Sequence, residues 1–547
     1  MSKKLSVLIS PLFVVSMLLG CAKSVPEIYK HNDNTDPITI CGKELKLEFT
    51  TEQYNKDVKF ADDLVASIKE GKDTYREISN KINEYYDITT RAEREYRKAY
   101  IISCMTVDNA DMKVADDAYA ATIKLNSYLT KIVVAIYQSK YKSNYFKGMS
   151  DQEIENYMKS FDENKNEALS EAMTRHNNIK TQYFVGERSI CDAVRQFVSC
   201  GNEIAVLEGY DNFVNYSYEK TYQRSYKVSD TKNLIDYARE YIYPIHYDLY
   251  TYVQGSMAGL SEAELTTYNE LHYGCFTKQL DLYDSFARDL GGNYNKNYKY
   301  LFNSGNYFLS EKPNPTTTAY TWDIDGEPLI FFGGGYQDVG TLAHEFGHYN
   351  ASRVGSDVGV SYDLCEVHSQ GSEAMFYNYA RNVAKENKRS YDLFFADRMD
   401  NFLTNFYVGV MINELEIKLY SQPDILNMSD DEIVKIVSDI VSYIRKGEEG
   451  ISTNVNGILD ILLVSPIYYI SYSTSVAASL ELMAEAYKDY KNAKGMYNKI
   501  YANYRRNTKI NDFMDVVSYA GLSNVFEEQA YKNINSFAKS FLEYLDK

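Results

Sequence analysis

The chain has 547 residues, of which 45% are apolar and 24% charged, and its formal net charge at pH 7 is -18. These proportions are those of an ordinary globular protein, which excludes global disorder, and the length allows more than one domain. The negative charge argues against a nucleic-acid partner, because phosphate backbones repel an acidic surface.

Residues 1–20 are predicted to form a secretory signal peptide. Lys3 and Lys4 precede an apolar stretch from Leu5 to Leu19, which is short for a membrane span. Leu18-Leu19-Gly20-Cys21 then resembles a bacterial lipobox, in which Cys21 is lipidated and becomes the mature N-terminus. We therefore expect a lipoprotein that a lipid on Cys21 anchors to the bacterial membrane, outside the cytoplasm. The alternative is an ordinary signal peptide followed by a chance cysteine.

Residues 21–45 are expected to form a flexible tether, since Pro26, Pro37 and a polar run lie between Cys21 and the folded body. From about residue 50 onward, apolar residues recur at spacings of three and four, and the whole chain has only 9 prolines. This pattern predicts a mostly α-helical fold. Ser-x-x-Glu capping boxes mark three helix starts, at Ser150/Glu153, Ser261/Glu264 and Ser429/Glu432.

The cysteines that follow Cys21 form no Cys-x-x-Cys pair, so a cysteine zinc site has no support. One disulfide can form in an oxidising compartment, with Cys191 and Cys200 as the candidate pair, but the sequence leaves the pairing open. The six residues are Cys41, Cys104, Cys191, Cys200, Cys275 and Cys365.

One interruption of the helical pattern is predicted. Asp325-Gly326 marks a turn, Leu329 to Phe332 is an apolar and aromatic run of strand length, and Gly333-Gly334-Gly335 closes it. A small β element is therefore expected directly before the next helix. The run is either a buried strand with no further role or an edge strand that pairs with an extended peptide.

The next helix carries the most specific motif of the chain, His344-Glu345-Phe346-Gly347-His348, with Asp338 as its candidate N-cap. Two histidines at positions i and i+4 project from one helical face, so both imidazoles can reach one ion. Catalytic zinc uses three protein ligands and a water. Glu345 is placed to take a proton from that water and to deliver it later to a leaving amine.

The third ligand must come from outside this motif. A metzincin would need Gly at position 351 and His at position 354, where this chain has Ala351 and Val354, so that class is excluded. The remaining route is a side chain on a following helix, and the candidates are Asp363, Glu366, His368 and Glu373.

The segment from Asp363 to Gln370, with Glu373 beyond it, resembles the E-x-x-S-Q region of the oligopeptidase F and thimet oligopeptidase family of zinc peptidases. In that family the first glutamate of this region is the third zinc ligand, which maps onto Glu366. The segments 209–224 and 466–472 resemble two further family segments, so the likeness runs from about residue 150 to residue 530. It favours the peptide-pairing role of the predicted strand, and Gln370 or Glu373 is a candidate to orient a ligand histidine.

The resemblance also implies that the tyrosine-rich segment at 466–472 faces the metal. Tyr469 and Tyr472 lie at i and i+3 on one helical face, where a phenol could donate to the oxyanion of a tetrahedral intermediate. The alternative is that both are core aromatics. Two departures stand out: Leu462 occupies a position where the family commonly has histidine, and the spacing from His348 to Glu366 is shorter than usual. His368 is two positions from Glu366, on nearly the opposite helical face, so we expect no metal contact from it.

Residues 461–480 carry no formal charge over 20 positions, the length of a membrane helix. Pro466, three tyrosines and several hydroxyl residues favour a buried channel wall instead.

The resemblance implies a mostly α, two-lobed helical zincin with a deep channel and one Zn²⁺ per chain. We expect an N-terminal helical domain over 46–200 and a catalytic domain over 201–547. The expected activity is hydrolysis of short peptides at the outer face of the membrane, with His344, His348 and Glu366 as metal ligands. Glu345 would act as the base, with Tyr472 and Tyr469 as oxyanion donors. The alternative is a catalytically silent, lipid-anchored protein that binds zinc or peptide. The oligomeric state is left open.

Overall fold

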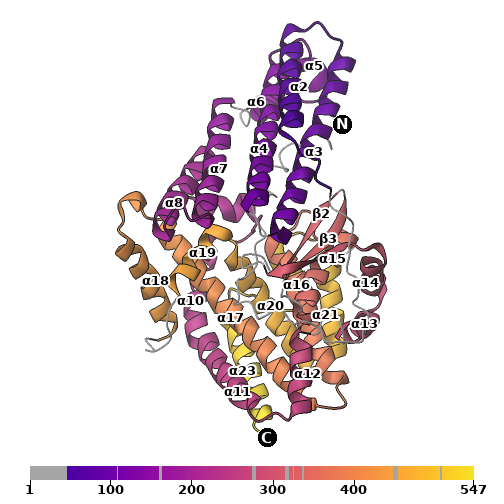
Figure 1. The fold of residues 1–547 in the computed structure, drawn as a ribbon, viewed down its shortest axis with the longest axis vertical. Coiled ribbons are helices and arrows are strands. Elements are labelled where there is room, and N and C mark those ends of the chain that lie inside the picture. Colours follow the sequence, from indigo (N-terminus) through magenta and orange to yellow (C-terminus); the bar gives the residue numbers. More distant parts are fainter. Residues whose placement is uncertain are drawn as a thin grey trace. The chain divides into compact units, whose positions relative to one another are not determined.

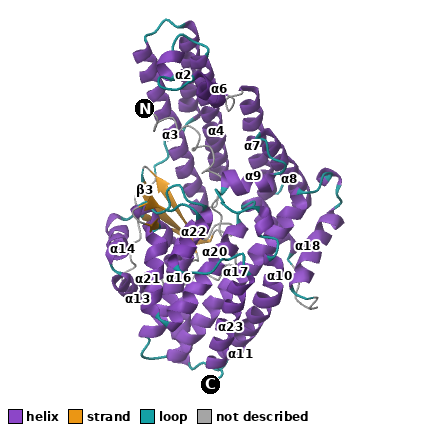
Figure 2. Cartoon of the chain, turned by 180° about the vertical axis from the view of Figure 1, so that it is seen from behind, coloured by secondary structure: helices purple, strands orange, loops and turns teal. Residues whose placement is uncertain are grey.

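The computed structural model describes residues 46–106, 109–158, 163–273, 279–313, 319–324, 326–334, 338–446, 454–505 and 508–547. The predicted signal peptide, Cys21 and the predicted tether lie outside these ranges. Within them the chain is mostly helical with two small sheets, which confirms the predicted fold class (Figure 2). The described residues form two compact units: unit 1 consists of 46–189 and Gln196–Phe213, and unit 2 of Ile190–Arg195 and Val214–Lys547.

Unit 1 is built on long amphipathic helices around its own core (Figure 1). Its helices are α2 (Thr51–Glu70), α3 (Tyr75–Thr106), α4 (Asn109–Tyr137), α5 (Lys142–Tyr145), α6 (Asp151–Met158), α7 (Glu163–Phe184) and most of α8 (Ile190–Leu207). The core includes Leu64, Tyr85 and Ile132, each at most 2% exposed. These apolar residues come from α2, α3 and α4 respectively, so one stripe of each helix closes the core.

Unit 2 contains most of the remaining helices. Their bounds are α9 (Phe213–Tyr216), η3 (Ser217–Thr221), α10 (Leu234–Tyr237), α11 (Tyr243–Met257), α12 (Glu262–Tyr273), α13 (Gln279–Leu290), α14 (Gly292–Ser304), α15 (Val339–Val354), α16 (Tyr362–Val383), α17 (Lys388–Tyr420), α18 (Asp430–Ile444), α19 (Val455–Val464), α20 (Tyr469–Lys488), α21 (Tyr490–Ala502), α22 (Phe513–Ala520) and α23 (Glu528–Leu545). The centre of the unit is a packed group in which α16 contacts α15 and α20, and α20 contacts α17. Most residues of α16 and α20 are buried, because these helices are packed between other helices of the unit.

A three-stranded sheet precedes α15 in the chain. Its strands are β1 (Tyr307–Pro313), β2 (Ala319–Ile324) and β3 (Glu327–Gly334), in the order β1-β3-β2. The predicted run from Leu329 to Phe332 lies in β3, which confirms the expected β element before the histidine helix. The expectation that this run is an edge strand is wrong, because β3 pairs with β1 on one side and with β2 on the other. Its backbone groups are therefore used inside the sheet, and β2 is an edge strand. A second, two-stranded sheet joins β4 (Tyr504–Arg505) and β5 (Thr508–Lys509).

The three predicted capping boxes are all formed. In each, the serine hydroxyl accepts from the backbone N–H of the glutamate at 3.3 Å, and the glutamate carboxylate accepts from the backbone N–H of the serine at 2.7–2.8 Å. Such caps satisfy backbone donors that the first helical turn leaves unpaired.

The suggested disulfide between Cys191 and Cys200 is wrong. Both residues are free thiols, and both lie on α8. They are nine positions apart along the helix, which corresponds to about 13 Å of helical rise and exceeds the reach of a disulfide.

Within the described residues, no single helix is long and apolar enough to cross a membrane. The bent pair α19 and α20, which meet at 96°, passes the same test of length and composition when taken together. This pair contains the uncharged stretch 461–480.

Candidate metal centre

The helix that carries the two histidines has a defined start and end. Asp338 is the N-cap of α15, and its side chain accepts from the backbone N–H of Gly340 at 2.6 Å, as predicted. Arg398 donates to the other carboxylate oxygen of Asp338 at 2.6 Å, so this helix start is tied to α17. Gly355 ends the helix in the left-handed conformation, with φ 71°.

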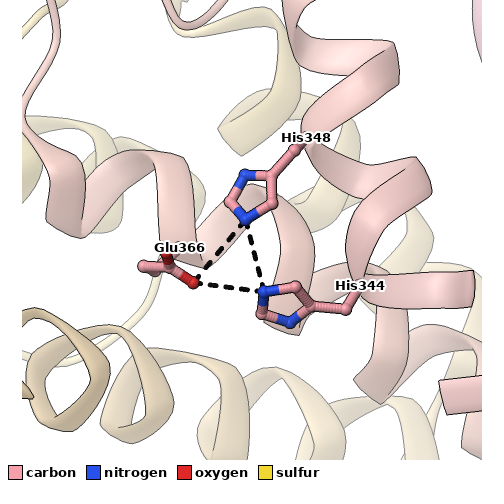
Figure 3. Close-up of side chains that lie close together, drawn as sticks. All are labelled: His344, His348 and Glu366. Carbon is pink, nitrogen blue, oxygen red and sulfur yellow. Dashed lines mark hydrogen bonds and ion pairs between the residues drawn. The ribbon is translucent and has the colours of Figure 1, made fainter. Parts of the chain in front are cut away.

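His344, His348 and Glu366 converge on one point (Figure 3). The two Nε2 atoms are 3.3 Å apart, and Glu366 Oε2 lies 3.4 Å from Nε2 of His344 and 3.7 Å from Nε2 of His348. Donor atoms around a tetrahedral zinc ion are about 3.3–3.5 Å apart, given metal–ligand distances of about 2.0–2.1 Å. The spacing and the donor types of these three residues therefore fit Zn²⁺.

Gly347 allows the two ligand-bearing helices to approach closely. A Cβ atom at this position would lie 2.5 Å from the Cα of Ser369 and 2.7 Å from the carbonyl oxygen of His368, both on α16. Only glycine fits against the neighbouring backbone here. The close approach brings Glu366 on α16 within reach of the histidines on α15, although the chain between the helices is short.

A carboxylate on α16 holds the first histidine. Glu373 Oε1 lies 2.8 Å from Nδ1 of His344, and Tyr377 donates to Glu373 Oε2 at 2.7 Å. A hydrogen bond at Nδ1 leaves the lone pair of Nε2 facing the other two ligands. The predicted orienting role therefore fits Glu373. Gln370 is buried, and no contact between it and either histidine is seen among the described residues.

The charges of the three ligand residues are strongly coupled. Burial lowers the pKa of His348 to about 4. Burial opposes ionisation of Glu366, yet His348 and His344 together hold the pKa of this carboxyl down at about 2. The pKa of His344 is raised well above its ordinary value, because its bonds to Glu366 and Glu373 outweigh the effect of burial. At neutral pH the group thus holds an ionised carboxylate and a protonated His344, and a divalent cation would take the place of that proton, because a metal ligand must be a neutral imidazole.

Glu345 lies beside these ligands and is 5% exposed. Thr321 on β2 donates to its Oε2 at 2.8 Å, so the edge strand holds this carboxyl in place. Burial raises the pKa of Glu345 to about 7. A carboxyl that exchanges its proton near neutral pH is suited to general base catalysis.

The tyrosine segment contributes a contact that the sequence did not predict. The hydroxyl of Tyr468 donates to Glu366 Oε1, which leaves Oε2 facing the histidines. Tyr472 is half-buried, and its ring packs edge-on against Tyr468 at 5.0 Å and Tyr469 at 5.5 Å. The catalytic roles of Tyr469 and Tyr472 stay predictions. Tyr468 was missed although it stands four residues before Tyr472, a spacing that places both on one helical side.

Leu462 and His368 both lie in the interior of unit 2. Leu462 is fully buried in α19. His368 is also fully buried, with its Nε2 3.4 Å from the carbonyl oxygen of Ile500, and it is not one of the converging ligands.

The chain thus combines a mostly helical fold with a His-Glu-x-x-His helix and a glutamate from the next helix, a set of residues that could hold a metal ion. No family model and no curated protein matches the sequence. Solved structures do match the fold. One is PZ peptidase A with an inhibitor, at TM-score 0.60 and 16% identity, over 91% of this chain and 98% of that one.

Two oligoendopeptidases give similar values. A protein from Bacillus anthracis str. Ames that is assigned as an oligoendopeptidase F matches at TM-score 0.58 and 17% identity, over 92% of this chain and 97% of that one. Oligoendopeptidase F from Enterococcus faecium matches at TM-score 0.55 and 12% identity, over 91% and 99%. The chain therefore has the fold of these proteins over nearly its whole length, in agreement with the resemblance seen in its motifs.

Proposed function

We propose that this chain is a zinc-dependent peptidase that hydrolyses short peptides. The observation that carries the proposal is the convergence of His344, His348 and Glu366 within metal-binding distance, with the buried carboxyl of Glu345 beside them. The fold supports the substrate class, because the structures it matches include oligoendopeptidases.

Each residue has a separate task in this mechanism. Bound zinc would polarise the scissile carbonyl and make water more acidic. Glu345 accepts a proton from the attacking water and passes it to the nitrogen of the leaving amine, so the peptide bond breaks with no net change of charge. Glu373 and Tyr468 hold the ligands His344 and Glu366 in place. The phenol of Tyr472 is the proposed donor to the oxyanion.

The test compares the wild-type chain with Glu345→Gln on a library of quenched peptides, with and without a chelator. We expect the chelator to abolish hydrolysis and Glu345→Gln to lower kcat by at least about 100-fold while the zinc content persists. The matched control is Glu414→Gln, which changes a half-buried glutamate on α17 that pairs with Lys418. Bound zinc without cleavage of any peptide would instead support the silent binding protein, a reading that the leucine at position 462 favours.

We further propose that a lipid on Cys21 anchors the protein at the outer face of the membrane. The support is the sequence order alone: two lysines, an apolar stretch and a lipobox. In a bacterial host, the wild-type chain should sediment with membranes and dissolve in detergent, whereas Cys21→Ser should not incorporate fatty acid. Equal fatty-acid labelling of both chains would contradict this proposal.

A further inference from the structure

The turn that leads into α20 has an unfavourable backbone conformation. Ile467 has φ 60°, in the left-handed region, where a β-branched residue is disfavoured by contacts with its own backbone. Such a conformation persists only when the surrounding structure holds it. The next residue is Tyr468, whose hydroxyl contacts the ligand Glu366.

Three buried side chains bind the backbone of this turn. Glu416 on α17 accepts from the N–H of Ile467 at 2.5 Å, and Arg224 donates to the carbonyl oxygen of the same residue at 2.8 Å. The hydroxyl of Tyr222 donates to the carbonyl oxygen of Pro466 at 2.5 Å. We call Tyr222, Arg224 and Glu416 the turn clamp.

The guanidinium of the clamp is itself fixed on several sides. Arg224 lies over the rings of Tyr218 and Tyr222, at 4.5 and 4.2 Å from their centroids. It donates to Ser471 Oγ at 2.7 Å and pairs with Asp363 at 3.6 Å. Arginine suits this position because its planar group can stack on rings and donate in several directions at once.

Asp363 connects the clamp to the helix of the third ligand. It lies three residues before Glu366 on α16, on the same side of the helix. Tyr226 and Thr474 both donate to its Oδ1 at 2.6 Å. The turn, α20 and the helix of the ligand are thus joined by one buried polar network.

Burial of the Glu416 carboxyl is energetically unfavourable. It is fully buried, and its Oε2 has no hydrogen-bond partner within the described part of the chain. Burial raises the pKa of this carboxyl to about 8, against the opposing effects of the Ile467 N–H and of Arg224. A carboxyl retained at such a cost commonly has a specific task.

We propose that the three residues of the turn clamp are positioning residues, which hold Ile467 in its left-handed conformation so that Tyr468 meets Glu366 and turns Oε2 toward the histidines. In this proposal they act through Tyr468 and not by direct contact with substrate or metal. The inference rests on the proposed function only for its catalytic readout, because metal binding measures the same geometry without substrate.

The first experiment substitutes Glu416 in two ways. Glu416→Met keeps the volume but cannot accept the Ile467 N–H, whereas Glu416→Gln keeps an acceptor. We expect Glu416→Met to weaken zinc affinity by about 10-fold or more and to lower kcat similarly, with KM within about 3-fold. Glu416→Gln should have a zinc affinity and a kcat near the wild-type values. A general loss of stability would not explain this difference between the two variants. The absorption spectrum of bound Co²⁺ should change with Glu416→Met alone.

A milder pair of variants keeps the test valid if Glu416→Met does not fold. Tyr222→Phe removes one bond from a buried phenol to a backbone carbonyl in the clamp. Tyr85→Phe removes an equivalent bond, to Leu125 at 2.6 Å, from the core of unit 1. We expect about 3–10-fold weaker zinc binding for Tyr222→Phe and no change for Tyr85→Phe.

Two outcomes separate the proposals. If folded Glu416→Met and Tyr222→Phe bind zinc and Co²⁺ like the wild-type chain, the positioning role is wrong. If the variants lose zinc affinity as expected but the wild-type chain cleaves no peptide, the clamp is supported and the proposed peptidase function fails.

Discussion

The orientation of His344 depends on a carboxylate that does not itself reach the metal position. Glu373 holds Nδ1, and Tyr377 holds Glu373, so the imidazole is fixed from the far side. Hydrogen bonds of this kind fix the tautomer and raise the basicity of the ligand nitrogen.

For this reason Glu373→Gln should weaken zinc binding by about 10–100-fold, while the fold stays intact. The neutral amide keeps the size of the side chain but not its charge. Competition with a chromophoric chelator measures the affinity, and Glu414→Gln is again the matched control. An unchanged zinc affinity would show that Glu373 has only a packing role.

Single residues differ in how well the sequence predicts them. His344, Glu345 and His348 lie within about one helical turn, so their spacing in the sequence is enough to predict that they act together. Thr321 and Tyr468 act across the fold, the first from β2 onto Glu345 and the second from the start of α20 onto Glu366. Their roles depend on which elements become neighbours, and no local pattern encodes that.

Among the elements, the contact between α15 and α16 decides whether the three candidate metal ligands meet. A side chain at Gly347 would strike backbone atoms of α16, which cannot rotate away as a flexible side chain could. The helices would have to separate, and Glu366 would move away from the two histidines.

Gly347→Ala should therefore lower the free energy of unfolding by about 1–3 kcal/mol and weaken zinc binding as well. Gly495→Ala is the matched control, because Gly495 lies within α21 with no heavy atom within 4 Å of the added Cβ. The control should be neutral or stabilising by up to about 1 kcal/mol. Denaturant unfolding and a zinc titration would measure the stability and the zinc affinity of both variants. If Gly347→Ala and Gly495→Ala behaved alike, the close approach of α15 and α16 could not be the cause of any loss.

The sequence predicted the elements better than their pairing. Turn signals and an apolar run located β3, but its central position follows from β1 and β2, which have no comparable signature. In the same way, Cys191 and Cys200 are close in sequence, and only the continuous helix α8 keeps them apart.

At the scale of the whole molecule, each unit has its own buried apolar residues, and the three candidate metal ligands all belong to unit 2. A ligand that binds only the folded state stabilises the part that binds it, by about 2.7 kcal/mol at a free concentration 100 times its Kd. The single tryptophan of the chain, Trp322, lies on β2 in unit 2, so its fluorescence reports on that unit.

Removal of the metal should then affect the two units differently. We expect a chelator to lower the Tm of the fluorescence transition, and circular dichroism to retain a helical component that the chelator does not shift. A chain kept without metal from purification onward is the control for effects of the chelator itself. A uniform shift of both signals would mean that the units unfold as one.

The mostly helical fold could be predicted from the sequence because helical periodicity and scarce proline extend over nearly the whole chain. The arrangement of the helices was accessible only through the resemblance of a few motifs, since packing of helices leaves no simple sequence pattern. The predicted deep channel between two lobes stays a prediction.

The turn clamp has a consequence for the order in which a newly made chain acquires its properties. The two histidines lie on one helix and are brought together when that helix forms, whereas Glu366 comes from the next helix. The bond from Tyr222 to Pro466 joins residues 244 positions apart, and it forms only after most of unit 2 has been synthesised and packed. If the chain is a peptidase as proposed, its activity would therefore require the packed fold of unit 2 and would not appear with the two histidines alone.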